Sequence, residues 1–182
     1  RAGTQLNKQE IRNALYQGNS TVLLKEITMS KLFSQATGDG LKNDNRMKDR
    51  YILLRFLGFY LLRGKVLFDE EDQSKIYTYY SVDELLARTM KYINSINEDD
   101  CKKIKEKMYF ALSNCIKYLG PDVFRLNQNG KRSPINMNIF ETIMYIMAQI
   151  PDTCNNKDVC GKINRLKSNQ QFLINIGNHR DS

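Results

Sequence analysis

Histidine is almost absent from this sequence, and its scarcity excludes several kinds of catalytic site. The one histidine, His179, lies three residues from the C-terminal residue. A serine or cysteine nucleophile needs a neighbouring base such as histidine, held firmly in place. The sequence also has no P-loop and no G-x-G-x-x-G fingerprint. Gly38-Asp39-Gly40 follows a helical pattern rather than a strand, so it lacks the structural context of a phosphate-binding loop. We therefore expect no catalytic centre in this chain and no bound cofactor.

Cysteine pairs at metal-binding spacing are also missing. The four cysteines, Cys101, Cys115, Cys154 and Cys160, form no C-x-x-C pair and have no histidine beside them, whereas zinc sites need closely spaced ligands. We expect no metal site and predict free thiols, which are typical of the reducing cytoplasm. The sequence shows no secretory signal and no apolar run long enough to cross a bilayer. These absences predict a cytoplasmic protein without a membrane partner.

Proline and glycine, the residues that interrupt helices, number only three and ten among 182 residues. Hydrophobic residues make up 41% and charged residues 26%, as in an ordinary soluble domain. Apolar residues recur mostly at spacings of three and four, the period of an amphipathic helix. No repeat or linker divides the chain. We therefore predict one all-α domain over residues 1–182, an irregular bundle of about seven to eight helices with at most one short β-hairpin. The hairpin would lie in 124–134, around the turn signal Asn129-Gly130.

The start and stop signals of the individual helices are legible. Asn7 and Glu10 have the spacing of a capping box. The helix that they open should end at Gly18 and bury its apolar residues, Ile11, Ala14 and Leu15. The remaining predicted helices are 20–32, 47–62, 81–96 with Ser81 and Glu84 as a second capping box, 99–119, 138–150, 156–166 and 168–176.

The segment 47–62 is apolar nearly all round, which predicts a helix at the centre of the bundle rather than on its surface. Gly58 within it predicts a close crossing with another helix. Arg55 is embedded among the apolar residues of this segment. Because a buried guanidinium needs hydrogen-bond acceptors, we expect a carboxylate or helix-end carbonyl groups beside Arg55.

The connection 63–80 carries three tyrosines that allow two interpretations. Tyr77, Tyr79 and Tyr80 could stack on the bases of a nucleic acid or pack the connection onto the helices. The acidic run 69–72 lacks the glycine and terminal glutamate of a calcium loop, so it reads as a solvated acidic loop.

Positive charge is in excess, with 28 lysine and arginine residues against 20 acidic ones and a formal net charge of +8. Such a surface suits a phosphate-bearing partner, since counterions are released on binding; the alternative is that the lysines only keep the protein soluble. Arg46 and Arg50 are four apart and should share a helix face, with Asp49 orienting one guanidinium. The alternative is an exposed ion pair worth about 0–1 kcal/mol. The candidate nucleic-acid contacts are Arg46, Lys48, Arg50, Arg125, Lys131 and Arg132, and structural roles are expected for Asn7, Glu10, Arg12, Asp49 and Arg55.

Two segments carry a resemblance to a known family. Residues 3–15, GTQLNKQEIRNAL, resemble the segment that follows an F-x-R-x-N-x-x-G stretch in ParB-like restriction proteins of the GmrSD type. Residues 46–56, RMKDRYILLRF, are similar to the D-R-x-x-x-L-R-F helix of that family, and the likeness extends to 119–125 and 135–140. The resembling stretches are spread from residue 3 to residue 140, so the resemblance spans most of the chain.

The resemblance implies a bacterial restriction or anti-phage protein in which a ParB-like domain handles nucleotide and supports DNA cleavage. The family signature D-G-Q-Q-R and the HNH nuclease domain of some members are not in this sequence. On this basis we expect a C-terminal helical fragment without its own catalytic centre, whose partners are an upstream ParB-like domain and DNA. The alternative function is a protein-interaction or homodimerisation module that uses an apolar surface near 6–16 and makes no contact with nucleic acid.

Overall fold

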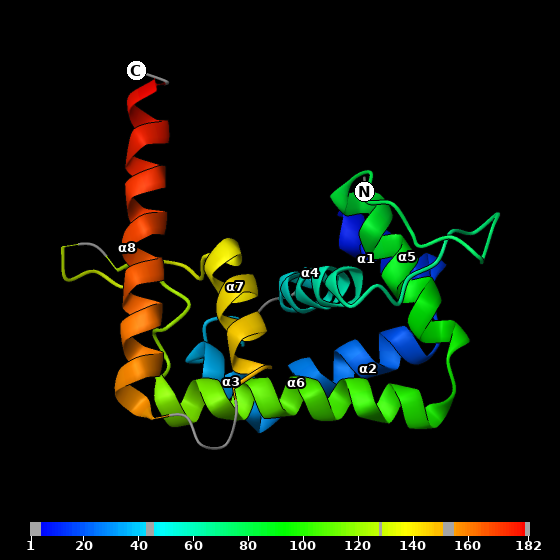
Figure 1. The fold of residues 1–182 in the computed structure, drawn as a ribbon, viewed down its shortest axis with the longest axis horizontal. Helices are drawn as coiled ribbons and strands as arrows, with labels where there is room; N and C mark the ends of the chain where they lie inside the picture. The colour runs from blue at the N-terminus through cyan, green and yellow to red at the C-terminus, as the bar shows by residue number, and fades with distance from the viewer. Residues whose placement is uncertain (1–4, 43–45, 128, 151–154, 181–182) are drawn as a thin grey trace.

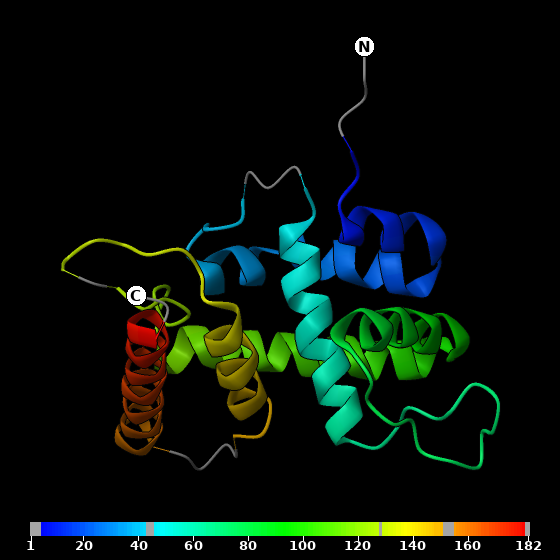
Figure 2. The same ribbon diagram turned by 90° about the horizontal axis from the view of Figure 1, so that it is seen from above.

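The structure is a computed structural model that describes residues 5–42, 46–127, 129–150 and 155–180. Over these ranges the chain forms eight α-helices and no extended strand, which confirms the predicted all-α bundle (Figures 1 and 2). The helices are α1 (Lys8–Leu15), α2 (Asn19–Thr28), α3 (Lys31–Thr37), α4 (Lys48–Arg63), α5 (Val82–Ser95), α6 (Glu98–Tyr118), α7 (Met137–Met147) and α8 (Asn156–Arg180). Among the described residues, none of the helices combines the length and the apolar character that crossing a membrane requires.

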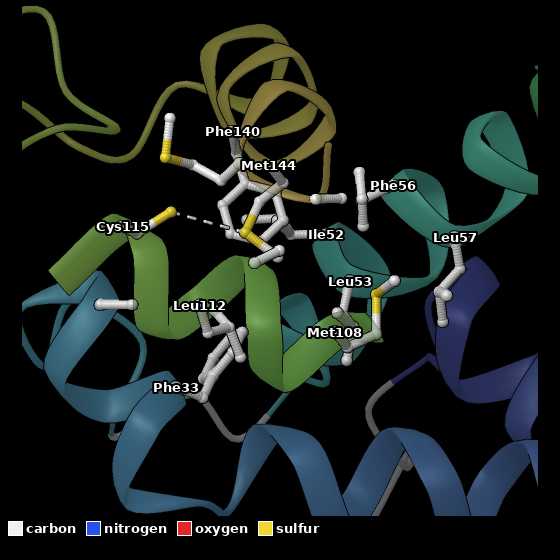
Figure 3. Packing of buried hydrophobic residues seen from close by; sticks show 14 of the residues in the cluster. Phe33, Ile52, Leu53, Phe56, Leu57, Met108, Leu112, Cys115, Phe140 and Met144 are labelled. Carbon is white, nitrogen blue, oxygen red and sulfur yellow. Dashed lines mark hydrogen bonds between the residues drawn. The ribbon is translucent and has the colours of Figure 1, made fainter. Parts of the chain in front are cut away.

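Helix α4 occupies the central position that its apolar sequence predicts. It packs against α1, α2, α5 and α7, while the long helix α6 lies below it and contacts α2, α3, α7 and α8 (Figure 1). Figure 3 shows the side chains where α4, α6 and α7 meet, including the Sγ of Cys115, which lies 3.8 Å from the Sδ of Met144. The residues labelled there are all nearly or fully buried: Phe33, Ile52, Leu53, Phe56, Leu57, Met108, Leu112, Cys115, Phe140 and Met144.

The predicted close crossing at Gly58 is confirmed. An added Cβ there would lie 3.1 Å from Thr89 Oγ1 and 3.2 Å from Leu85 Cγ, both on α5. Helices α4 and α5 can approach this closely only because residue 58 has no side chain. The crossing also fixes the N-terminal end of α5 relative to α4, and this matters for the site described below.

Several predicted helix boundaries were wrong. The single helix expected over 20–32 is divided into α2 and α3, because the Ser30 hydroxyl accepts a hydrogen bond from the backbone N–H of Phe33 and so starts a new helix. Ser20, at the predicted start of that helix, is buried inside α2, where its hydroxyl donates to the carbonyl of Tyr16. The two short helices expected after residue 155 form one continuous helix, α8.

The predicted hairpin is reduced to one antiparallel bridge between Arg125 and Ile135. Asn129 and Gly130 have positive φ angles of 51° and 71°, as the turn signal predicts. A second isolated bridge joins Phe68 and Ile76 in the connection between α4 and α5.

Two of the three tyrosines in that connection pack against the protein. Tyr77 is buried, so the packing interpretation holds for it. The ring of Tyr79 lies 5.9 Å from that of Phe59, although the residue stays 44% exposed. Tyr80 is 82% exposed and faces solvent. Cys101, Cys115 and Cys160 are free thiols as predicted, and Cys154 lies outside the described residues.

Candidate anion-binding site

A basic cavity of about 580 Å³ lies where α1, α4 and α5 meet. Residues at or near the start of all three helices line it. Two of the predicted nucleic-acid contacts, Arg46 and Lys48, belong to this lining. The complete lining is Asn7, Lys8, Gln9, Arg12, Arg46, Lys48, Tyr51 and Asp83.

The start of α1 positions one wall of the cavity. The expected capping box is present: Asn7 Oδ1 accepts from the backbone N–H of Glu10 at 2.8 Å, and Glu10 Oε2 accepts from that of Asn7 at 2.7 Å. Asn7 Nδ2 also donates to the carbonyl of Arg46 at 2.7 Å. The guanidinium of Arg46 donates to the carbonyl of Gln5 at 2.8 Å and pairs with Glu10 Oε2 at 3.2 Å. These contacts fasten the chain leading into α4 to the start of α1.

Helix α1 turns a different face inward from the one predicted. Gln9 and Arg12 are buried, with 3% and 7% exposure, whereas Ile11 and Leu15 are 43% and 68% exposed and Ala14 is also exposed. The prediction failed because burial of Arg12 depends on a carboxylate far along the chain, Asp83 on α5. Capping and helical spacing carry no information about that partner.

Arg12 is the buried cation of the cavity lining. Its Nε donates to Gln9 Oε1 at 3.1 Å, one terminal nitrogen donates to Asp83 Oδ1 at 3.3 Å, and the guanidinium carbon lies 5.7 Å from the centre of the Tyr51 ring. Because a guanidinium can only donate, the oxygen of the Gln9 amide must face Arg12. The amide nitrogen of Gln9 is then left buried, and it has no hydrogen-bond acceptor in the part of the chain that the structure describes.

The electrostatic balance of the cavity is positive. Four cations line it, Lys8, Arg12, Arg46 and Lys48, against the carboxylate of Asp83 in the lining and that of Glu10 beside it, which pairs with Arg46. The hydrogen bond from Lys8, 2.6 Å long, and the charges of Lys8 and Arg12 hold the pKa of Asp83 below its ordinary value, so this carboxylate is ionised at neutral pH. Guanidinium, ammonium and amide donors around one space, at helix N-termini, suit an anion with several oxygens, such as phosphate.

Arg50 does not share this cavity, and the predicted common face of Arg46 and Arg50 was wrong. Met47, the residue before α4, has a left-handed backbone with φ 59°, so Arg46 lies outside the helix. Arg50 lines a separate hollow with residues of α1 and α2. Asp49 Oδ1 accepts from the backbone N–H of Arg50 at 2.7 Å and so stabilises the first turn of α4.

The second predicted basic segment lies far from this cavity, beside α8 at the opposite end of the molecule (Figures 1 and 2). Arg125 is only 6% exposed, and its guanidinium donates to the carbonyls of Ser133 at 2.5 Å and Thr37 at 3.3 Å. Arg132 donates to Asp122 Oδ1 and to the carbonyl of Gly38, both at 2.9 Å. These two arginines hold the 121–135 segment against the end of α3, and Arg125 is an interior residue rather than a surface cation. Lys131 is exposed nearby.

Arg55 has the carboxylate partner that its buried sequence context predicts. Its guanidinium pairs with Glu141 of α7 and approaches the sulfur of Met137 at 3.0 Å. Removal of the Glu141 carboxyl from water raises its pKa, and the charges of Arg55 and Arg63 oppose this effect. The pair lies within the α4–α7 contact and has a structural role.

Four residues of the cavity were not among the predicted site residues: Lys8, Gln9, Tyr51 and Asp83. Gln9 is three residues before Arg12, which is a contact distance on a helix, so the sequence contained a usable signal for it. Asp83 had none, since it is 71 residues from Arg12. Over the described ranges, no group of three or more histidine, cysteine, aspartate or glutamate side chains could hold a metal ion.

Comparison of the chain with protein-family models, with curated proteins and with solved structures finds no match. The functional assignment therefore rests on the geometry and charge of the site.

Proposed function

We propose that this chain is a helical domain that contacts nucleic acid, DNA in the first instance, through the basic cavity between α1, α4 and α5. The observation that carries the proposal is the gathering of Lys8, Arg12, Arg46 and Lys48 around one cavity at three helix N-termini. In this proposal the domain is a scaffold and DNA-contacting part of a bacterial restriction protein of the GmrSD type, and the nucleotide-dependent cleavage belongs to other parts of that protein.

Three features support contact with a polyanion. The chain has a formal net charge of +8, and electrostatic attraction to phosphates supplies most of the non-specific affinity for DNA. The lining contains one carboxylate against four cations. The segments 3–15 and 46–56 that resemble the GmrSD-type proteins are also the segments that build two walls of the cavity.

Lys48 offers the cleanest test of DNA contact. It is exposed, and it makes no hydrogen bond or ion pair with the described residues, so its replacement should leave the fold intact. We expect Lys48→Glu to weaken binding of a labelled duplex about 5- to 10-fold near physiological salt and to reduce the slope of log K against log salt by about one. Fluorescence anisotropy over a salt series measures both quantities.

Lys162→Glu provides the matched control. Lys162 is an exposed lysine of α8, at the opposite end of the molecule from the cavity (Figure 1), and its replacement changes the net charge by the same amount. It should leave the affinity close to that of the unchanged protein. Equal affinities of the Lys48→Glu variant and the unchanged protein at every salt concentration would refute DNA contact at the cavity.

The outward face of α1 favours a second candidate function, protein docking. Four large apolar side chains at the start of the chain are strongly exposed: Leu6 at 56%, Ile11 at 43%, Leu15 at 68% and Val22 at 62%. Ile11 and Leu15 are four apart on α1 and share one face, and exposed apolar side chains that lie together are typical of an interaction surface. Light scattering at high concentration distinguishes self-association from a monomer, and a monomer at every concentration would exclude the homodimer.

A further inference from the structure

The buried amide of Gln9 needs an explanation that the fold itself does not provide. Gln9 is only 3% exposed, it lines the cavity, and its Nε2 has no acceptor among the described residues. Leaving a buried donor without a partner is costly, so such a group needs an explanation, and a bound ion is one. Gln9 belongs to the lining of a space with excess positive charge, where an anion would be the natural acceptor.

Arg12 has unused donors beside this amide. A guanidinium carries five N–H groups, and Arg12 uses its Nε for Gln9 and one terminal nitrogen for Asp83. The other terminal nitrogen makes no hydrogen bond with the described residues. Gln9 and Arg12 are both more than nine-tenths buried, so their donors are held in place before a ligand arrives, which lowers the entropic cost of binding.

Asp83 lies against these donors in the way that a bound anion would. One carboxylate oxygen accepts from Lys8 Nζ at 2.6 Å, and the other accepts from Arg12 at 3.3 Å. The side chain is 55% exposed, so a rotation about its side-chain bonds would release both cations. An oxyanion that entered the cavity would compete with Asp83 for Lys8 and Arg12.

We propose that the cavity holds a single phosphate group through Gln9 Nε2 and the Arg12 guanidinium, and that Asp83 is a built-in competitor that pairs with the cations while the site is empty. This inference rests on the proposed function and names the group that the cavity recognises. The phosphate has two possible sources with the same chemistry: the backbone of a nucleic acid, or a free phosphate or nucleotide.

Two substitutions in the full chain test the proposal from opposite directions. Asp83→Asn removes the competitor and should tighten phosphate binding about tenfold, since a like charge at the site is removed. Gln9→Glu keeps an acceptor for Arg12 but replaces the free donor with a negative charge, and it should weaken binding by at least about tenfold. Asp99→Asn is the control for the first variant, because Asp99 is an exposed aspartate in the first turn of α6.

The measurements are calorimetric titrations with inorganic phosphate and with ATP, and anisotropy with a labelled DNA duplex. If the Asp83→Asn variant binds all three ligands more tightly and the Gln9→Glu variant binds them more weakly, the proposal holds with a free phosphate or nucleotide as a sufficient ligand. If the same order appears only with DNA, the proposal holds and the source is the nucleic-acid backbone. In either case the side-chain amide resonances of Gln9 should shift when the ligand is added.

The proposal is overturned if the Asp83→Asn variant binds every ligand no more tightly than the Asp99→Asn control. This outcome stays readable even if Gln9→Glu fails to fold, because the Asp83 side chain is 55% exposed and an asparagine of the same shape keeps an oxygen that can accept from Arg12. If Lys48→Glu weakens DNA binding while Asp83→Asn and a folded Gln9→Glu do not change it, the proposed DNA contact stands. The proposed phosphate site at Gln9 and Arg12 is then refuted. If none of the three variants changes DNA binding, the proposed function itself is refuted.

Discussion

Replacing Gly58 by alanine tests how strictly the α4–α5 crossing constrains the sequence. In the interior of an isolated helix the change would stabilise the protein by about 0.5–1 kcal/mol, because glycine loses more backbone entropy on folding. In this structure the new Cβ would lie 3.1 Å from Thr89 Oγ1 and 3.2 Å from Leu85 Cγ, which is closer than ordinary van der Waals contact.

The neighbours of Gly58 have little freedom to move away. Thr89 and Leu85 are both fully buried, and the Thr89 hydroxyl is held by a hydrogen bond to the carbonyl of Leu85 at 2.7 Å. Forcing an extra methyl group into a packed contact costs about 1–3 kcal/mol, which exceeds the gain in helix propensity. We therefore expect Gly58→Ala to lower the free energy of unfolding by about 1 kcal/mol. Urea denaturation followed by circular dichroism should show a midpoint lower by roughly 0.5 M with an unchanged slope.

Gly64, at the end of the same helix, provides the matched control. Its φ of −73° suits any residue, and the nearest atom to an added Cβ, the carbonyl oxygen of Tyr60, is 3.5 Å away. Gly64→Ala should therefore stabilise the protein by about 0.4–1 kcal/mol. If Gly58→Ala stabilised the protein as much as Gly64→Ala does, α5 would have to move away from the new methyl group with no loss of stability. The close-crossing explanation would then be refuted.

Two further predictions concern α1 and the α4–α7 contact. Ile11→Gln and Leu15→Gln should each change the free energy of unfolding by less than about 0.5 kcal/mol. The comparison variant Leu24→Ala, at a fully buried position of α2, should lower it by about 2–5 kcal/mol. A loss above about 2 kcal/mol in either glutamine variant would contradict the outward orientation of α1. Burial raises the pKa of the Glu141 carboxyl in the folded state, so the native protein binds the carboxyl proton more tightly than the unfolded chain does. The contribution of Glu141 to stability therefore decreases as the pH rises from the ordinary pKa through the raised one. Denaturation of the unchanged protein and of Glu141→Gln between pH 4 and 7 should show the variant gaining relative stability with rising pH, and parallel curves would disprove the raised pKa.

The helices with the clearest periodicity could be predicted from sequence because their burial depends on their own composition. Residues 47–62 carry apolar side chains on every face, so α4 had to be central wherever its neighbours lay. The boundary signals at Asn7 and Ser81 were also reliable, since capping is a contact between residues three apart. The cap at Ser30, in contrast, lies inside a continuous apolar pattern that does not reveal it, so the one predicted helix is two in the structure.

The candidate site was predictable only in part. Arg46 and Lys48 were singled out from local charge, and both line the cavity. Their expected partner Arg50 does not, because the left-handed backbone at Met47 separates Arg46 from the helix. A change of one backbone angle redirects every side chain before it, and local charge patterns do not reveal such a change.

The sequence by itself determined that the chain is helical, that it is basic, that α4 is its centre and where most caps lie. All of these depend on residues within one or two turns of each other or on total composition. Only the tertiary structure decided which face of α1 is buried and that Lys8, Arg12, Lys48 and Asp83 surround one cavity. The physical reason is that Arg12 can be buried only where a distant carboxylate and an aromatic ring compensate its charge, and the crossing of α4 and α5 at Gly58 brings the α5 end that carries Asp83 to that place.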